Sequence, residues 1–327
     1  MKAIIRTEYG GTEQVRLAER PDPVAGRGEV LVEVRAAGLD RGVWHLMHGV
    51  PRLVRLGIGI RRPRQPILGR DLAGVVVALG EGVTELALGD EVLGTSAHGT
   101  LAELAPARID RLVPKPRGWT FEQAAALPVS GLTALQAVQG VGRIQPGQRV
   151  LVVGASGGVG SFAVQLARHA GADVDAVCGP DKLDLVRGLG AERVTAYGEG
   201  ADLPGEGAAG PRYDVVLDIG GARPLKRLRS VLTPRGTLVI VGGERGGRWL
   251  DGLHRQLTAL LLSPVSRQRL AAFVATEKAT ELARLVALAE AGACTPVLDG
   301  TWSLVEAPAA LDHLAKGRAR GKVVVTV

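Results

Sequence analysis

Four glycines that follow a short apolar run could bring the main chain close to a phosphate group. Gly154, Gly157, Gly158 and Gly160 come directly after the run VLVV at 150–153. Behind them, apolar residues recur with the i, i+3, i+4, i+7 spacing of an amphipathic helix. A turn without Cβ atoms lets a pyrophosphate approach the backbone, where its charge meets the unpaired N–H groups of a helix N-terminus. The pattern predicts a dinucleotide-binding strand–turn–helix, and a tight turn without a ligand is the simplest alternative.

A serine in the same turn permits a second interpretation. Residues 154–158 (GASGG) also match the G-x-S-x-G nucleophile elbow, with Ser156 as the nucleophile, and that elbow sits on a strand–turn–helix as well. A serine hydrolase would need an acid and then a histidine further along the chain, and Asp218 with His254 or His313 could serve. The glycine two positions beyond the elbow favours phosphate binding, because a hydrolase does not require it.

The residues after the next expected strand bear on which dinucleotide could bind. NAD-binding proteins usually place Asp or Glu about 20 residues after the glycines, whereas this chain has Cys178 and then Gly179. A carboxylate about 4 Å from a 2′-phosphate would cost on the order of 4 kcal/mol near a protein surface, so its absence permits NADP. Lys182 can supply positive charge, and Tyr197 could flank the adenosine, although Asp181 lies beside the lysine. We expect NADPH as the cofactor, with NADH possible.

The elements that must position this turn alternate along the second part of the chain. From about residue 121, strand-like apolar runs alternate with helical patterns of roughly 8–15 residues, which predicts a parallel sheet with helices on both faces. We expect strands at 150–153, 173–178, 193–197, 214–218 and 237–241. We expect helices from Val159, from about Asp181, and over 225–232, 267–276 and 281–291.

The first and last parts of the chain have a different pattern. Residues 29–36 (EVLVEVRA) are apolar at alternate positions, which is typical of a half-buried strand, and similar short runs are separated by Gly and Pro. Strand character returns near the end of the chain. The length of 327 residues suggests two domains. We expect one domain at 1–120 with 293–327 and the other at 121–292, in an α/β fold.

The composition favours a soluble globular protein in a reducing compartment. Hydrophobic residues make up 46% of the chain and charged residues 22%, which suffices for packed cores and a hydrated surface. The sequence contains no run of about 18 apolar residues and no signal-peptide pattern at its start. Two cysteines, Cys178 and Cys294, are too few for a disulfide framework. We expect a cytoplasmic protein that does not bind membranes.

The basic charge does not by itself indicate nucleic-acid binding. Lys and Arg number 40 against 33 Asp and Glu, which gives +7, but aromatic residues make up only 3% and no zinc-finger or RNP-type motif is present. The one dense basic stretch contains Arg52, Arg55, Arg61, Arg62 and Arg64. We interpret it as a solvated loop that also attracts anions, and we expect no nucleic-acid partner.

With these residues in view, the chain resembles the medium-chain dehydrogenase/reductase superfamily, in its zinc-free quinone oxidoreductase-like branch. The resemblance covers almost the whole chain. It implies a GroES-like β-rich catalytic domain, a Rossmann doubly wound parallel-sheet domain, and a nicotinamide between them. The motifs that carry it are MKAI (1–4), GEVLVEVRAAGLD (28–40), LGRDLAGVVVALGEGV (68–83), GDEVLG (89–94), EQAAALPVSGLTAL (122–135), GQRVLVVGASGGVG (147–160), YDVVLDIGG (213–221), GTLVIVGG (236–243) and RGKVVVTV (320–327).

The resemblance also bears on metal binding. Zinc-dependent relatives carry Cys, a His-Glu pair and a second Cys or acid where this chain has Asp40, then Arg70 with Asp71, and Ser130. Zinc prefers about four ligands of Cys, His or carboxylate type, and Arg70 is a cation. We expect no catalytic zinc. Without a Lewis acid, reduction of an already electrophilic quinone or enone is an easier reaction than alcohol oxidation.

By resemblance, the cofactor contacts come from both parts of the chain. Related sequences often carry Asn in place of Asp40, and Ser with a basic or amide residue around Gly179 to Lys182, so the chain departs from the pattern there. The implied NADPH-binding residues are Ser130, Thr133, Gly157, Gly158, Val159, Gly179, Lys182, Tyr197, Asp218, Ile219, Gly242, Gly243 and Lys322.

The expected reaction is hydride transfer from the nicotinamide to a quinone or an α,β-unsaturated carbonyl, followed by protonation. Asp40, His45 and His48 are the candidate proton donors, and histidine titrates near neutral pH. A different class of function is also open: an NAD(P)H-binding redox sensor or interaction protein with little turnover. Relatives tend to be homodimers, so we expect a homodimer.

Overall fold

The computed structural model describes residues 1–198, 203–206, 212–243 and 253–327, and the chain divides into two compact units. One, here called the β-rich unit, comprises Met1–Leu132, Thr276–Gly292 and Pro296–Val327. The other, here called the parallel-sheet unit, comprises Thr133–Ala275 and Ala293–Thr295. The units differ from the expected domain boundaries mainly because helix α9 (Ala279–Glu290) groups with the β-rich unit.

The described residues of the β-rich unit contain a seven-stranded sheet with the order β14-β15-β3-β4-β5-β7, in which β6 also pairs with β3. β14 and β15 are parallel, and the other pairs are antiparallel. A separate antiparallel pair is formed by β1 and β2. The bounds are β1 Lys2–Arg6, β2 Val15–Glu19, β3 Glu29–Leu39, β4 Asp71–Leu79, β5 Glu91–Thr95, β6 Leu104–Arg108, β7 Leu112–Pro114, β14 Leu298–Ser303 and β15 Lys322–Thr326.

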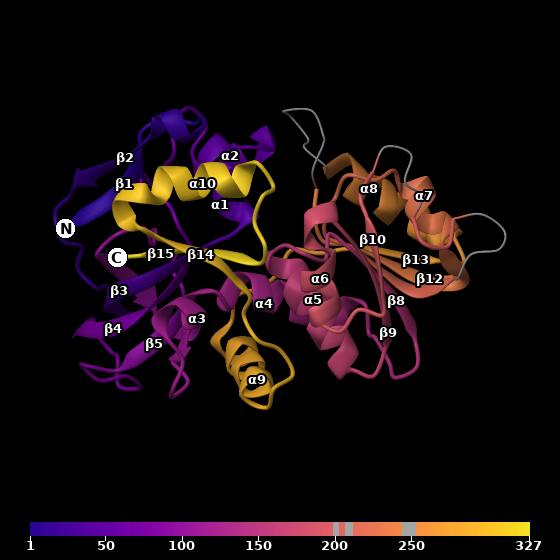
Figure 1. Cartoon of the computed structure of the whole chain (residues 1–327). Helices are drawn as coiled ribbons and strands as arrows, with labels where there is room; N and C mark the ends of the chain where they lie inside the picture. Colours follow the sequence, from indigo (N-terminus) through magenta and orange to yellow (C-terminus); the bar gives the residue numbers. More distant parts are fainter. Residues whose placement is uncertain (199–202, 207–211, 244–252) are drawn as a thin grey trace. The chain divides into compact units, whose positions relative to one another are not determined.

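The alternation in β3 explains the core of this unit. Val30, Val32 and Val34 are buried on one face of the strand and join the main apolar cluster of the unit. Helix α10 (Ala307–Ala315) lies against β15 and α1, as the yellow helix in Figure 1 shows. The other helices are α1 Arg41–His48, α2 Arg55–Ile58 and α3 Phe121–Ala125, and α4 Pro128–Leu135 crosses the boundary between the units.

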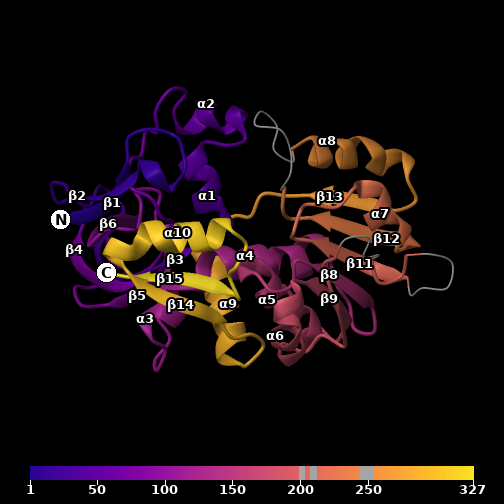
Figure 2. The same cartoon turned by 45° about the horizontal axis from the view of Figure 1, so that its top comes forward.

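The parallel-sheet unit contains, in its described residues, a six-stranded sheet with the order β10-β9-β8-β11-β12-β13. Every pair is parallel. Helices α5 and α6 lie on one face and α7 and α8 on the other (Figures 1 and 2). This is the doubly wound Rossmann order, and the strand order reverses between β8 and β11. The bounds are β8 Arg149–Val153, α5 Gly158–His169, β9 Asp173–Cys178, α6 Leu183–Gly188, β10 Arg193–Ala196, β11 Tyr213–Asp218, α7 Leu225–Ser230, β12 Leu232–Ile240, α8 Leu253–Leu262 and β13 Arg269–Ala272.

One expected element is wrong. The sequence analysis predicts a helix over 267–276, but this segment contains strand β13, which pairs in parallel with β12. A short apolar run that is buried in a sheet cannot be distinguished from a buried helix segment by periodicity alone. The fold class itself is confirmed. In the described part of the chain, no helix combines the length and the hydropathy that a membrane crossing requires.

Candidate functional site

The glycine-rich turn joins β8 to α5 in the parallel-sheet unit. Gly154 has a φ of +92°, and the amides of Gly154 and Ala155 both donate to the Val177 carbonyl on β9, at 2.9 and 3.0 Å. A Cβ on Gly160 would lie 2.1 Å from the Gly154 carbonyl oxygen, so the helix can pack on the turn only with glycine there. The fold itself therefore requires these two glycines.

Gly157 is different, because no described neighbour requires a glycine at this position. It is the N-cap of α5, its φ of −86° and ψ of −179° are open to any residue, and no side chain caps the helix. A Cβ on Gly157 would come only to 4.0 Å from the Gly154 carbonyl oxygen. Gly157 thus leaves space beside the first amides of α5, which have no partner within the helix. Helix N-terminal amides of this kind are common binding sites for phosphate groups.

Three predicted residues, Gly179, Lys182 and Tyr197, gather at the carboxyl ends of β9 and β10. The Lys182 amide donates to the Gly179 carbonyl at 3.0 Å, and the Tyr197 amide donates to the Cys178 carbonyl at 2.8 Å. A Cβ on Gly179 would lie 3.6 Å from Cδ of Lys182, so the lysine side chain runs beside this glycine. Arg223, which the sequence analysis missed, has its guanidinium carbon 5.7 Å from the centre of the Tyr197 ring. The structure adds a second cation to this group.

Asp218, Ile219 and Gly242 meet at the carboxyl ends of β11 and β12, and Gly243 follows directly. The Gly242 amide donates to the Asp218 carbonyl at 3.1 Å, and a Cβ on Gly242 would lie 2.0 Å from the Ile219 carbonyl oxygen. The Asp218 side chain is fully buried and pairs with Arg255, with 2.5 Å between Oδ2 and Nη2. Burial raises the pKa of Asp218, and the Arg255 guanidinium opposes that shift.

These contacts bear on the serine-hydrolase alternative. Activation of a serine requires a histidine that is oriented by an acid. The nominated acid, Asp218, binds Arg255 instead. His254 is exposed, and His313 bonds to Asp299 within the β-rich unit. The nominated groups therefore do not form the acid–histidine pair that a hydrolase needs.

A buried polar cluster lies in the β-rich unit, where β4, α4 and β15 begin. Lys322 Nζ lies 2.8 Å from Asp71 Oδ2 and donates to Ser130 Oγ at 3.2 Å. Asp71 Oδ1 accepts a hydrogen bond from the Val129 amide at 2.8 Å. The side chains of Asp71 and Lys322 are 0% and 1% exposed. The structure thus brings together the predicted residues Ser130 and Lys322, and Asp71 joins them.

The surroundings of Asp71 disfavour its charged form. Burial raises the pKa of Asp71 to about 7, the Lys322 ammonium opposes the shift, and the nearby Asp40 adds to it. Gly38 on β3 leaves room for this carboxylate, because a Cβ there would lie 2.8 Å from Asp71 Oδ2. Thr133, three residues beyond Ser130 on α4, belongs to the parallel-sheet unit.

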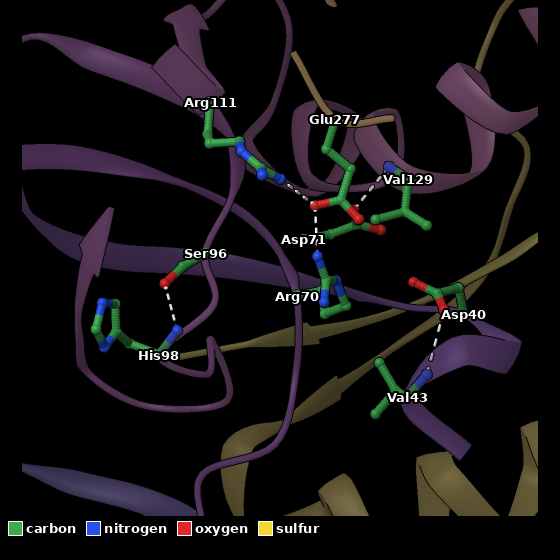
Figure 3. Close-up of polar contacts among 9 residues, drawn as sticks. All are labelled: Asp40, Val43, Arg70, Asp71, Ser96, His98, Arg111, Val129 and Glu277. Carbon is green, nitrogen blue, oxygen red and sulfur yellow. Dashed lines mark hydrogen bonds and ion pairs between the residues drawn. The ribbon is translucent and has the colours of Figure 1, made fainter. Parts of the chain in front are cut away.

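The two carboxylate oxygens of Asp40 have different surroundings. Oδ1 caps α1 by accepting hydrogen bonds from the amides of Gly42 and Val43, at 2.6 and 3.2 Å. Figure 3 shows the bond from Val43. Oδ2 is buried and has no hydrogen-bond partner among the residues that the structure describes. One oxygen therefore holds the helix, and the other is left to accept a hydrogen bond.

The two candidate histidines lie on α1, one and four residues after Trp44 in the sequence. The ring centroids of Trp44 and His45 are 5.1 Å apart, and those of Trp44 and His48 are 4.2 Å apart. His48 Nδ1 lies 3.1 Å from the Trp44 carbonyl oxygen. Packing against the indole fixes the orientation of both imidazoles relative to the helix.

Arg70 and Arg111 point toward Glu277, which precedes α9 (Figure 3). Glu277 Oε2 lies 2.6 Å from Arg70 Nη2 and 3.0 Å from Arg111 Nη1. In the described part of the chain, no group of three or more His, Cys, Asp and Glu side chains could hold a metal ion. Of the residues at the positions where relatives carry zinc ligands, Arg70 pairs with Glu277, and Asp71 and Ser130 both contact the Lys322 ammonium. This donor set does not fit zinc.

The sequence analysis missed Asp71, Glu277 and Arg255 as site residues. Asp71 was noted only as an occupant of a zinc position in the resemblance. Its partner Lys322 lies 251 residues away, and Glu277 lies 207 residues from Arg70. No spacing rule relates residues so far apart, so the only available signal was a carboxylate at the start of an apolar strand.

The two units and the glycine turn define a nucleotide-binding enzyme fold with a GroES-like part and a Rossmann part. Residues 26–117 match the family model described as the alcohol dehydrogenase GroES-like domain, and residues 189–325 match the one described as zinc-binding dehydrogenase. A chloroplastic quinone oxidoreductase from Triphysaria versicolor is 34% identical over 99% of this chain and 98% of its own length. The chain belongs to the medium-chain dehydrogenase/reductase superfamily, in its quinone oxidoreductase-like branch.

Other relatives and solved structures agree with this assignment. The quinone oxidoreductase from Coxiella burnetii superposes with a TM-score of 0.85 at 27% identity, covering 100% of this chain and 99% of that one. A mycobacterial protein in complex with NADPH superposes with a TM-score of 0.81 at 26% identity, covering 100% of both chains. The spectinabilin polyketide synthase protein NorB from Streptomyces orinoci is 36% identical over 97% of this chain, which spans only 14% of that protein. By its family, the chain is an oxidoreductase of the nicotinamide-dependent kind.

Proposed function

We propose that the chain is a zinc-independent, NADPH-dependent reductase of quinones or α,β-unsaturated carbonyl compounds. The proposed substrate is a small molecule that is already electrophilic. We further propose that the protein is a homodimer located in the cytoplasm, as expected from its sequence.

The observation that carries the cofactor assignment is the open space at Gly157. Gly154 and Gly160 are explained by the fold, but Gly157 is not, and a side chain there would occupy the cradle beside the first amides of α5. Gly157, Gly158 and Val159 would hold the pyrophosphate there. Gly179, Lys182 and Tyr197 would hold the adenosine end, and the positive charge of Lys182 favours NADPH. Ser130, Thr133, Asp218, Ile219, Gly242, Gly243 and Lys322 complete the proposed set.

The donor chemistry in the β-rich unit supports a reaction without zinc. Arg70 pairs with Glu277, and Asp71 pairs with Lys322, so the side chains at these positions are committed to ion pairs. Without a metal to polarise a carbonyl, the substrate itself must be a good hydride acceptor. Quinones and enones meet this condition.

When bound, NADPH supplies a hydride from its nicotinamide. The residues of this chain then have to supply a proton and hold the substrate. His45 or His48 would donate the proton to the oxyanion or enolate, because a histidine can carry a proton near neutral pH. Asp40 Oδ2 would accept a hydrogen bond or relay a proton, while Oδ1 keeps α1 in place.

The test is to add NADPH and NADH to the purified protein and to follow their absorbance with a panel of quinones and enones. We expect consumption with at least one acceptor and a preference for NADPH. Binding without consumption across the panel would support the redox-sensor alternative instead. Failure to bind either nucleotide would overturn the proposal altogether.

A further inference from the structure

The segment between Asp40 and Asp71 is unusually basic. Residues 41–70 contain seven arginines and no lysine, aspartate or glutamate. Their charge of +7 equals the formal net charge of the whole chain. The proposed reduction gives no role to the other six arginines beside Arg70.

Tyr9 connects the N-terminal part of the β-rich unit to this segment. Its hydroxyl donates to the carbonyls of Ile58 and Gly59, at 3.2 and 2.6 Å. Its ring packs against Arg55, whose guanidinium carbon lies 4.2 Å from the ring centre. Hydrogen bonds from the hydroxyl and a cation–π contact with the ring therefore hold the Tyr9 side chain in place.

Arg55 also joins this region to the helix that carries the candidate proton donors. Its Nε donates to the Gly49 carbonyl at 2.8 Å, and its Nη2 donates to the His48 carbonyl at 3.1 Å. These carbonyls lie at the C-terminal end of α1, where positive charge is stabilised by the helix dipole. A ligand held beside Arg55 would thus lie close to α1.

Arg6, at the end of β1, is the unusual member of the group. It is only 4% exposed, and its guanidinium carbon lies 5.5 Å from the centre of the Tyr9 ring. Among the residues that the structure describes, its Nε and Nη1 are buried and have no hydrogen-bond partner. Burial lowers the pKa of Arg6 to about 10, so the side chain still carries its charge at neutral pH. A buried cation without an anion is costly to the folded protein, which suggests that a bound anion compensates the charge.

We propose that the guanidinium groups of Arg6 and Arg55, which together with Tyr9 are here called the Arg6 cluster, receive an anionic group of the substrate, either a carboxylate or a phosphoryl group. This inference rests on the proposed function, because it assigns the substrate class of the same enzyme: an electrophilic carbonyl compound that carries an acid group. Guanidinium groups suit this role, because their planar donors match carboxylate and phosphate oxygens. The surrounding arginines attract anionic substrates electrostatically, whereas neutral substrates gain no such attraction.

The first test measures anion binding without any cofactor. Titration calorimetry with succinate and, separately, with inorganic phosphate would show which of the two groups is preferred. Arg6→Met keeps much of the side-chain volume and removes the buried charge, so we expect it to fold with a melting temperature at least as high as that of the wild type. We expect its affinity for the preferred anion to fall by about tenfold or more.

Arg62→Met is the matched control. Arg62 is exposed in the same basic segment, so this variant should keep the affinity of the wild type apart from a small change in surface charge. Equal losses in Arg6→Met and Arg62→Met would mean that the segment attracts anions only diffusely, and would overturn the proposal. Absence of binding of both anions to the wild type would overturn it as well. Arg6→Lys should recover part of the affinity, because lysine restores the positive charge but not the planar set of guanidinium donors.

The second test uses turnover of a matched pair of substrates, β-benzoylacrylic acid and its methyl ester. Both are enones, and only the first carries a carboxylate. We expect Arg6→Met to lower the ratio of kcat/KM for the acid over the ester by about tenfold or more, mainly through KM for the acid. An unchanged ratio would overturn the proposal. If the wild type reduces neither compound and consumes NADPH with no quinone or enone of the panel, but Arg6→Met abolishes anion binding, the Arg6 cluster stands and the proposed reductase function fails.

Discussion

The glycine turn of the parallel-sheet unit and the polar cluster of the β-rich unit are built in opposite ways. In the turn, the main chain provides the polar groups, and side chains matter by being absent, as at Gly157 and Gly160. In the cluster, the site is made of side chains, above all the buried pair of Asp71 and Lys322. The turn is specified mainly by residues 154–160, with two hydrogen bonds to Val177 on β9, whereas the cluster depends on a contact between residues 251 positions apart.

This difference determines how each region should respond to mutation. A backbone site tolerates changes that leave space free and fails when a Cβ fills that space. A site made of buried charges fails when one partner is removed, because the remaining charge loses its compensation. Substitutions in the buried pair should therefore affect stability most, and substitutions in the turn should affect it less.

The largest effect should come from removing the ammonium group of the buried pair. Lys322→Met leaves the Asp71 carboxylate buried without its partner, and we expect a loss of about 3–5 kcal/mol in the free energy of unfolding at about pH 8. Chemical denaturation would measure this loss. Lys316→Met removes one partner of a pair in which both side chains are about half exposed, and it should have little effect.

The pH dependence of the same variant sharpens this prediction. The folded pKa of Asp71, about 7, lies above its ordinary value of 3.8, so the folded state binds more protons than the unfolded state between these values. The contribution of Asp71 to stability is therefore present at low pH and declines as the pH rises toward 7. In Lys322→Met this decline should extend to higher pH, because the opposing ammonium is gone. A loss of stability that is the same at about pH 6 and about pH 8 would contradict this account.

A smaller effect on stability is expected in the turn. Gly160→Ala places a Cβ against the Gly154 carbonyl, and we expect a loss of about 1–3 kcal/mol in the free energy of unfolding. Gly157→Ala meets no such neighbour, so it should cost less than about 1 kcal/mol but weaken NADPH binding by about tenfold. Denaturation and fluorescence titration with NADPH would separate the two variants. If Gly157→Ala bound NADPH as well as the wild type, the cradle would not be the pyrophosphate site.

Asp40 should show a still smaller effect that separates its two oxygens. Asp40→Ala removes the cap of α1 and should cost about 1 kcal/mol in the free energy of unfolding, whereas Asp40→Asn still caps the helix and should cost little. Thermal denaturation measures this difference. Any loss of turnover that Asp40→Asn shares with Asp40→Ala then belongs to the chemistry of the carboxylate rather than to the fold.

No effect at all is expected from metal removal. Dialysis against EDTA should leave NADPH consumption unchanged, because Arg70 and Lys322 pair with Glu277 and Asp71 in the region where relatives hold zinc. Elemental analysis of the purified protein gives the control. Stoichiometric zinc whose removal abolishes turnover would contradict the proposed zinc-independent reaction.

The parallel-sheet unit was largely predictable because its signals are local. The strands at 150–153, 173–178 and 214–218 correspond closely to β8, β9 and β11, and the helix after Val159 corresponds to α5. The failure at 267–276 has a local cause too, since the short buried run reads equally as helix or strand. Only its pairing with β12 makes it β13.

The β-rich unit was predicted as a fold but not as a set of contacts. Ser130 and Lys322 were selected by resemblance, whereas their joint contact with Asp71 depends on how β4, β15 and α4 come together. Arg6 and Tyr9 gave no signal in the sequence, and the basic stretch was interpreted as a solvated loop that also attracts anions, without a defined site. Their connection became visible through the bonds from Tyr9 to Ile58 and Gly59.

The amino-acid order alone determined that a glycine turn links a strand to a helix, because that motif is specified by residues that are close neighbours along the chain. It also determined that residues 41–70 carry seven arginines and no acidic residue. The tertiary structure alone decided which charges face each other: Asp71 with Lys322, Asp218 with Arg255, and Arg6 with no carboxylate in the described chain. The physical reason is that the energy of a buried charge depends on its neighbours in space, and chain packing selects those neighbours without regard to their separation in sequence.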